Sequence, residues 1–272
     1  MGAHYLTPLF TPDSIALFGA SDREDAVGGI VFRNLLESGF EGRIYAMNPR
    51  RDEVQGQPAY RSLSDVDDTI DLAVVATPAA GIPDIVEQCG KHGVPMMLIL
   101  SAGFREIGAA GRRLEDQVMQ QARQYGIRVM GPNCLGLIRP SAGINLTFGK
   151  NNATAGNLAL VSQSGAICTS ILDWSGRQKV GFSYFISIGS QGDVDFADAI
   201  REIAGTELAQ TRQRTGMRVA TMLVAAFAVF AAVAFLARRV LPGSSEGATR
   251  RTSFSHRADG FRGAFEVLQT LG

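Results

Sequence analysis

The stretch that decides the fold is residues 14–29, with the sequence SIALFGASDREDAVGG. Its apolar run, residues 15–18, predicts a buried parallel strand that ends at Gly19, and a helical pattern begins near Gly28. Open α/β sheets bind phosphate with such a strand, glycine turn and helix, because the helix N-terminus offers unpaired N–H groups and a positive dipole end. The same unit also occurs in sheets that bind nothing, so the turn alone leaves both interpretations open.

The alternation of short apolar strands and helical patterns continues along the chain. It predicts a Rossmann-like, doubly wound parallel sheet over residues 5–148 and a truncated second α/β unit over 149–205. Residues 206–272 form a divergent tail. The further strands are expected at 43–47, 72–76, 96–100, 128–130, 157–161 and 182–186, with helices at 82–92 and 106–125.

Charge and cysteine content exclude several classes of protein. The net charge is zero, and no basic patch is interleaved with aromatic residues, so nucleic acid is not an expected partner. Residues 201–272 hold ten arginines, no lysine and five acidic residues, which sets them apart from the acidic remainder. Cys89, Cys134 and Cys168 show no disulfide or metal-ligand spacing, which favours a reduced cytoplasmic compartment and no metal.

The first two strand ends distinguish between possible nucleotide ligands. The turn Gly19-Ala20-Ser21 is not the GxGxxG of a dinucleotide site, and the second strand ends in Asn48 where an NAD site needs an acidic residue. Arg50 and Arg51 follow, and arginine favours a phosphorylated ribose such as that of coenzyme A (CoA). An NAD(P)-dependent oxidoreductase is therefore the less favoured alternative.

Six short motifs occur in one order along the chain: GAS (19–21), MNP (47–49), ATPA (76–79), SAGFRE (101–106), GPNCLG (131–136) and VSQSGA (161–166). This ordered set resembles the NDP-forming acyl-CoA synthetases, which include the ADP-forming acetate–CoA ligases, and the succinyl-CoA synthetase alpha subunit. It also resembles the synthetase-like part of protein lysine acetyltransferases. The resemblance covers about residues 5–200.

The resemblance implies a role for each motif. CoA would lie with its diphosphate at the first motif, its adenosine end at the second, its pantetheine along the third and its thiol near the fourth and fifth. The implied CoA residues are Gly19, Ala20, Ser21, Gly28, Asn48, Pro49, Arg51, Thr77, Pro78, Ser101, Ala102, Gly103, Phe104, Asn133 and Cys134.

The sixth motif and Cys134 carry further expectations. By the resemblance, Ser162, Gln163, Ser164, Gly165 and Ala166 would receive the phosphate of a phosphohistidine, although a plain N-cap at Ser164 explains the same residues. Cys134 is interpreted as a buried structural thiol, because no base accompanies it in its motif.

The resemblance predicts CoA or acyl-CoA binding by a fragment or subunit of an NDP-forming acyl-CoA ligase. The nucleotide-binding ATP-grasp part of the family has no counterpart here, so a partner subunit is expected to supply it. The catalytic residues are unassigned. His256 is the one candidate phosphohistidine, but Arg257 and Ala258 replace the Thr-Gly of the family loop.

The tail departs from the family. Residues 219–237 carry no charge, and as a helix they would span roughly 28 Å, close to the bilayer core, with Arg218, Arg238 and Arg239 at the ends. This predicts a transmembrane helix that anchors the cytoplasmic N-terminal region to the inner face of a membrane. An inactive, membrane-anchored CoA-binding module is the alternative function, and a buried core helix or a frameshifted or fused tail are alternatives for the segment. The first residues show no secretory signal.

Overall fold

The computed structural model describes residues 5–213, with side chains as far as residue 206. The chain divides into two units, Met1–Glu202 and Ile203–Gly272. Of the second unit, only residues 203–213 are described, as the C-terminal part of helix α6 (Phe196–Gln213). All the contacts of the candidate site lie within the first unit.

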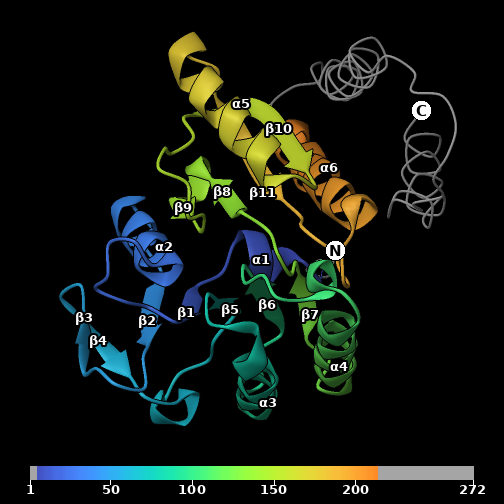
Figure 1. The fold of residues 1–272 in the computed structure, drawn as a ribbon. Coiled ribbons are helices and arrows are strands. Elements are labelled where there is room, and N and C mark those ends of the chain that lie inside the picture. The colour runs from blue at the N-terminus through green and yellow to red at the C-terminus, as the bar shows by residue number, and fades with distance from the viewer. Residues whose placement is uncertain (1–4, 214–272) are drawn as a thin grey trace, which may run out of the picture. The chain divides into compact units, whose positions relative to one another are not determined.

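The first sheet has seven strands in the order β3-β4-β2-β1-β5-β6-β7 (Figure 1). All neighbouring pairs are parallel except β3 and β4, which form an antiparallel hairpin. Every residue of β1, β5 and β6 is buried, as expected for continuous apolar strands that are covered on both faces. The strands are β1 (Ser14–Phe18), β2 (Arg43–Met47), β3 (Glu53–Val54), β4 (Gln57–Tyr60), β5 (Leu72–Val75), β6 (Met96–Ile99) and β7 (Arg128–Met130).

Helices cover both faces of this sheet. The connections β1-α2-β2 and β5-α3-β6 lead in opposite directions along it, so right-handed crossovers place α2 on one face and α3 and α4 on the other. Ala16 and Phe18 of β1 belong to the core on the α3 and α4 side. The helices are α1 (Thr7–Phe10), α2 (Val27–Glu37), α3 (Ile82–His92) and α4 (Ala109–Gln124), with short 3₁₀ turns η1 (Leu63–Asp65), η2 (Ala79–Gly81), η3 (Arg105–Ile107) and η4 (Pro140–Ala142).

The order of strands reverses between β1 and β5, which are neighbours although β2 follows β1 in the chain. In open α/β sheets, ligands bind at such a switch point, outside the carboxyl ends of the strands. The turns after Phe18 and Val75 therefore mark the expected ligand position.

The second sheet is smaller and mixed. Its order is β10-β11-β8-β9, with β10 and β11 parallel and β8 antiparallel to both β11 and β9. Helix α5 (Gly165–Gln178) connects the parallel pair. The strands are β8 (Gly136–Arg139), β9 (Ile144–Asn145), β10 (Ala155–Ser162) and β11 (Phe182–Ser187).

Two parts of the predicted fold class need correction. Both sheets are mixed rather than purely parallel, because the β3–β4 hairpin and the β8 pairings are antiparallel. The predicted membrane anchor also fails: none of the helices within residues 5–213 combines the length and the apolar character needed to cross a bilayer. The segment assigned to that anchor, residues 219–237, lies outside the described residues.

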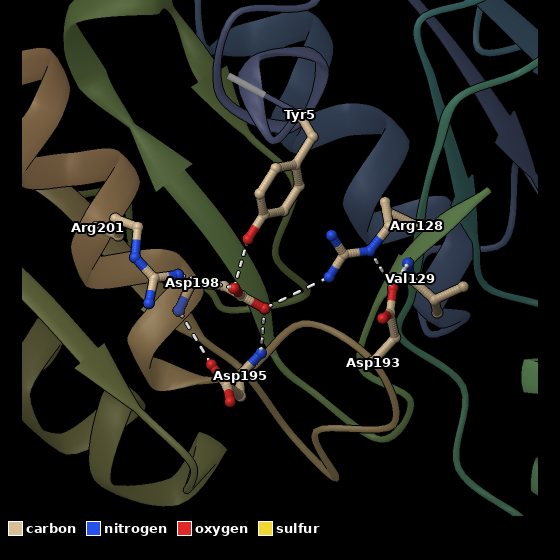
Figure 2. Close-up of polar contacts among 7 residues, drawn as sticks. All are labelled: Tyr5, Arg128, Val129, Asp193, Asp195, Asp198 and Arg201. Atoms are coloured by element: carbon tan, nitrogen blue, oxygen red, sulfur yellow. Dashed lines mark hydrogen bonds and ion pairs between the residues drawn. The ribbon is translucent and has the colours of Figure 1, made fainter. Parts of the chain in front are cut away.

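A polar network joins the amino end of β7 to the segment after β11 (Figure 2). Arg128 donates from Nε to Asp193 at 2.7 Å and pairs through Nη2 with Asp198 at 3.4 Å. Tyr5 donates its hydroxyl to Asp198, and its ring lies 4.4 Å from the Arg128 guanidinium. This network lies at the amino ends of the parallel strands, opposite the edge at which ligands are expected.

Candidate functional site

The β1–α2 turn is held against the first turn of helix α2 by glycine contacts. A Cβ on Gly28 would lie 1.9 Å from the Gly19 carbonyl oxygen, and one on Gly29 would lie 2.2 Å from the Arg23 carbonyl oxygen. Gly19 itself has φ +92°, and a Cβ there would lie 2.8 Å from the Ala76 carbonyl oxygen. A residue with a Cβ would force the backbone to move at each of these positions, so the close packing of the turn against α2 requires glycine there.

The N-terminus of helix α2 lacks a side-chain cap. Ala26 occupies the N-cap position with extended backbone, and the first turn contains no acidic residue. The first N–H groups of a helix have no intrahelical partner, and the dipole makes this end favourable for an anion. The turn can therefore hold a phosphate group, as the sequence predicts.

Hydrogen bonds connect the carboxyl ends of neighbouring strands into one edge. Asn48, after β2, donates from Nδ2 to the Ala20 carbonyl at 2.8 Å. Ser101, after β6, donates from Oγ to the Thr77 carbonyl at 2.5 Å. The Asn133 N–H, after β7, donates to the Ser101 carbonyl at 3.0 Å. The structure thus brings together the predicted residues from five strand ends.

Thr77 provides an unsatisfied polar group at the switch point. Its Oγ1 is buried and has no hydrogen-bond partner among the described residues. Its methyl carbon Cγ2 lies 3.1 Å from where a Cβ on Gly19 would be, so the Thr77 side chain lies beside the turn after β1. Buried hydroxyl groups are nearly always hydrogen-bonded, so a polar ligand atom would complete this position.

The two arginines after Asn48 differ in their contacts. Arg51 pairs through Nη1 with Asp22 Oδ2 at 3.3 Å. Arg50 is exposed, and among the described residues its guanidinium forms no ion pair; its backbone N–H donates to Asn48 Oδ1 at 2.9 Å. Arg50 is therefore the more available cation, although both lie beside the turn.

Some of the predicted residues do not face an open edge. Phe104 is fully buried in the core that packs against α3 and α4. Cys134 is buried, its Sγ lies 3.4 Å from the Ile99 carbonyl oxygen, and burial raises the pKa of its thiol to about 12. A thiol with that pKa stays protonated near neutral pH and is a poor nucleophile.

Other predicted residues are accessible to solvent: Pro49, Pro78 and Ala102 are exposed, and Gly103 is partly exposed.

The loop after β6 is fixed by a carboxylate. Glu106 accepts hydrogen bonds from the backbone N–H groups of Gly103 and Phe104, the second at 3.1 Å. Partial burial alone would raise the pKa of Glu106, but these N–H groups outweigh it and lower the pKa. Glu106 therefore holds the predicted thiol-end loop as an anion.

The turn between β10 and α5 is built from serines. Ser164 caps the helix by accepting from the Ile167 N–H at 3.3 Å, and Ser162 Oγ accepts from the Ser164 N–H at 3.1 Å. A Cβ on Gly165 would lie 3.4 Å from the Leu135 Cβ and 4.0 Å from Ser187 Oγ, so this glycine is less tightly packed than Gly28. Gln163 and Ala166 are exposed. The cap predicted at Ser164 is present.

The sequence interpretation missed Gln55 and Asp22. The expected strands did not include residues 53–58, which form the β3–β4 hairpin; its Gln55 makes three hydrogen bonds to the β1–α2 turn and the first turn of α2. His256 lies outside the described residues, and within them no cluster of candidate metal ligands occurs.

The fold is a doubly wound α/β domain, whose strand order reverses between β1 and β5, followed by a second α/β unit. Residues 13–140 match the family model of the CoA binding domain, and residues 155–227 match the succinyl-CoA ligase like flavodoxin domain. Over these residues the chain is thus similar to part of the NDP-forming acyl-CoA synthetases and contains a CoA-binding domain match. The resemblance inferred from the six motifs is confirmed.

Relatives and solved structures agree with this assignment. The chain is 39% identical over 199 residues to the alpha subunit of acetate–CoA ligase [ADP-forming] I from Pyrococcus furiosus, which covers 72% of this chain and 43% of the relative. It is 41% identical over 189 residues to acetate–CoA ligase [ADP-forming] from Methanocaldococcus jannaschii, covering 70% of this chain and 26% of the relative.

Two solved structures show the same fold at similar identity. PH0766 from Pyrococcus horikoshii OT3 has a TM-score of 0.71 at 40% identity, covering 73% of this chain and 45% of that one. Dinucleotide forming acetyl-coenzyme A synthetase 1 from Candidatus Korarchaeum cryptofilum, in complex with phosphate and ADP, has a TM-score of 0.69 at 37% identity, covering 72% and 42%.

The matched lengths bear on the tail and on activity. The chain spans less than half the length of these relatives. The flavodoxin-domain match continues to residue 227, so it includes the first part of the segment that was assigned to a membrane helix. Hydropathy alone does not distinguish a helix that crosses a bilayer from an apolar helix of an α/β core.

Proposed function

We propose that the chain binds CoA or acyl-CoA along the carboxyl edge of its first sheet, with the diphosphate at the N-terminus of helix α2. One observation carries the proposal: an uncapped, glycine-packed helix start lies beside the end of β2, where Asn48 follows the strand instead of an acidic residue. The free N–H groups of the helix start favour an anion, and Asn48 stands where an NAD site needs a carboxylate to bind the ribose hydroxyl groups. The match to the CoA binding domain supports the same ligand.

The residues of the edge suit the successive parts of CoA. Arg50 and Arg51, with Asn48 and Pro49, provide charge and surface for the phosphorylated adenosine end. The unpartnered hydroxyl group of Thr77, beside Pro78, offers a hydrogen bond along the pantetheine path. The thiol end lies near Ser101, Ala102, Gly103 and Asn133, while the buried Phe104 and Cys134 support this wall from behind.

We propose further that the chain acts as part of an NDP-forming acyl-CoA ligase, which interconverts acyl-CoA, NDP and phosphate with acid, CoA and NTP. The relatives are named for such ligations, and this chain spans less than half of each. A complementary part with a nucleotide-binding ATP-grasp domain would supply NDP. The turn of Ser162, Gln163, Ser164, Gly165 and Ala166 would then receive the phosphoryl group at the N-terminus of α5.

Titration calorimetry of the 272-residue chain with CoA and with NAD tests the ligand. We expect saturable binding of one CoA per chain and no measurable binding of NAD at the same concentrations. Equal binding of both ligands, or of NAD alone, would contradict the proposal and revive the dinucleotide interpretation. A parallel assay with ATP or GTP, acetate and CoA is expected to show no turnover until a complementary nucleotide-binding subunit is added.

A further inference from the structure

Gln55 lies at the tip of the β3–β4 hairpin, where it adopts a backbone conformation that glutamine rarely takes. Its φ is +49°, and Gly56 follows at +74°. Two positive φ values in a two-residue hairpin turn are typical of type I′, which favours asparagine or glycine at the first position. A glutamine there suggests that its side chain makes contacts that offset the strain.

Those contacts all reach the β1–α2 turn. Gln55 Nε2 donates to the carbonyl oxygens of Ser21, at 2.8 Å, and of Gly29, at 2.9 Å. The Gln55 backbone N–H donates to Asp22 Oδ1 at 2.8 Å, and the other oxygen of Asp22 pairs with Arg51. One residue of the hairpin therefore joins the middle of the turn to the first turn of α2.

Holding a carbonyl group also sets the direction of the next N–H group, because the two point in opposite directions across a planar trans peptide. The Gln55 bond to Ser21 thereby fixes the Asp22 N–H, and the Asn48 bond to the Ala20 carbonyl fixes the Ser21 N–H in the same way. Both carbonyl oxygens, which would repel a phosphate, are occupied by amide donors from other strands. The N–H groups of the turn are left in fixed orientations.

We propose that Gln55 is a positioning residue, which holds the β1–α2 turn in the conformation that presents its N–H groups to the CoA diphosphate. The inference rests on the proposed function, since it names how that site is kept ready. Gln55 acts through the turn and does not itself contact CoA. Its effect should therefore be the same for every ligand that carries the diphosphate.

The test compares Gln55→Gly with Gln57→Gly in the full chain. Glycine suits the positive φ and keeps the backbone N–H to Asp22, so Gln55→Gly removes the side chain with its amide donor and leaves that hydrogen bond in place. Gln57 is an exposed glutamine on the same hairpin, so its variant controls for loosening of the strands. Gln55→Glu is a second variant, with nearly the same shape but no amide donor at neutral pH.

We expect Gln55→Gly to weaken CoA and dephospho-CoA by the same factor, about tenfold for two lost hydrogen bonds, while Gln57→Gly changes neither. Gln55→Glu should weaken both ligands at least as much, because its carboxylate also repels the carbonyl oxygens of Ser21 and Gly29. Wild-type affinity in both Gln55 variants would overturn the inference and leave the proposed function intact. A loss confined to CoA would also overturn it, because the effect would then lie at the 3′-phosphate. Failure of the wild-type chain to bind CoA would overturn the proposed function, and this inference with it.

Discussion

The two strand–turn–helix units, β1–α2 and β10–α5, look alike in sequence and are built on different principles. In the second unit, Ser164 caps its own helix and Ser162 holds the N–H of Ser164. In the first, helix α2 has no side-chain cap, and the turn is shaped by glycine contacts and by amide groups of Asn48 and Gln55 from other strands. A side-chain cap occupies one of the first N–H groups of a helix. When residues of other segments hold the turn instead, these N–H groups stay available to a ligand.

The β1–α2 and β10–α5 units also differ in how deeply their residues are buried. Every residue of β1 is buried, whereas the first four residues of β10 are exposed. Trp174 and Ile167 on α5 are 52% and 47% exposed. The β1–α2 unit therefore starts from a fully buried strand, whereas the β10–α5 unit is partly exposed.

The largest expected effect comes from adding a methyl group to the packed glycine of the first unit. Gly28→Ala would place a Cβ 1.9 Å from the Gly19 carbonyl oxygen, so the turn must move away from α2. We expect a loss of about 1–3 kcal/mol in the free energy of unfolding and loss of CoA binding, measured by urea denaturation and calorimetry.

The matched control is Gly81→Ala, at a glycine with ordinary φ and nothing within 4 Å of the added Cβ. It should change the free energy of unfolding by less than about 0.5 kcal/mol and leave CoA affinity intact. Normal CoA affinity in Gly28→Ala would show that the packed turn is not the ligand site.

The next effect concerns the 3′-phosphate of CoA. Arg50 carries the guanidinium that forms no ion pair among the described residues, so the wild-type chain should bind CoA about 1.5–3 kcal/mol more tightly than dephospho-CoA, and Arg50→Ala should remove most of this difference. Arg61→Ala, which removes another exposed arginine, pairing with Asp52, is the control. Calorimetry that finds equal affinity of the wild-type chain for the two ligands would exclude a 3′-phosphate contact.

Exchanging the caps of the two helices sharpens the comparison directly. Ala26→Ser would give α2 a cap, because Ala26 already has the extended backbone of an N-cap residue, and Ser164→Ala would remove the cap of α5. We expect the first to raise and the second to lower the free energy of unfolding by about 1 kcal/mol each. Ala26→Ser should also weaken CoA binding, since the new hydroxyl group competes for the same N–H groups. Added stability with unchanged CoA affinity would argue against those N–H groups as the phosphate site.

The smallest effect is the pH dependence from Glu106. Its pKa is lowered in the folded chain, so it contributes stability above its unfolded pKa of about 4.3, and that contribution is lost as the pH falls through the lower folded value. Urea unfolding between pH 7 and pH 3 should therefore show a shallower loss of stability in Glu106→Gln than in the wild-type chain. Identical pH profiles would mean that the N–H groups of Gly103 and Phe104 do not hold this carboxylate.

Local patterns in the sequence were sufficient for the parallel strands and most helices of the first sheet. The predicted strand 43–47 and helix 82–92 coincide with β2 and α3, and Gly93 ends α3 at φ +79°. Such elements can be predicted because an apolar run and the glycine or proline that ends it are local signals, contained within a few consecutive residues. The predicted helix 106–125 begins later, at Ala109, because Arg105–Ile107 forms a separate 3₁₀ turn.

The features that the sequence missed depend on contacts between distant segments. Gln55 lies 34 residues from Ser21, and its role appears only when the β3–β4 hairpin packs beside β1. Likewise, Arg51 was predicted to be a CoA contact, but pairing with Asp22 could not be foreseen from local spacing. The predicted transmembrane helix rested on apolar length alone; none of the helices in residues 5–213 could cross a bilayer, and the segment itself, residues 219–237, lies outside the described residues.

Hydrogen exchange of the backbone amides, with and without CoA, tests the central claim most directly. If the diphosphate lies at the N-terminus of α2, CoA should slow exchange across residues 19–30 and leave residues 162–167 of the serine-capped turn unchanged. Slower exchange at residues 162–167 alone, or at neither turn under conditions in which CoA is bound, would contradict the account.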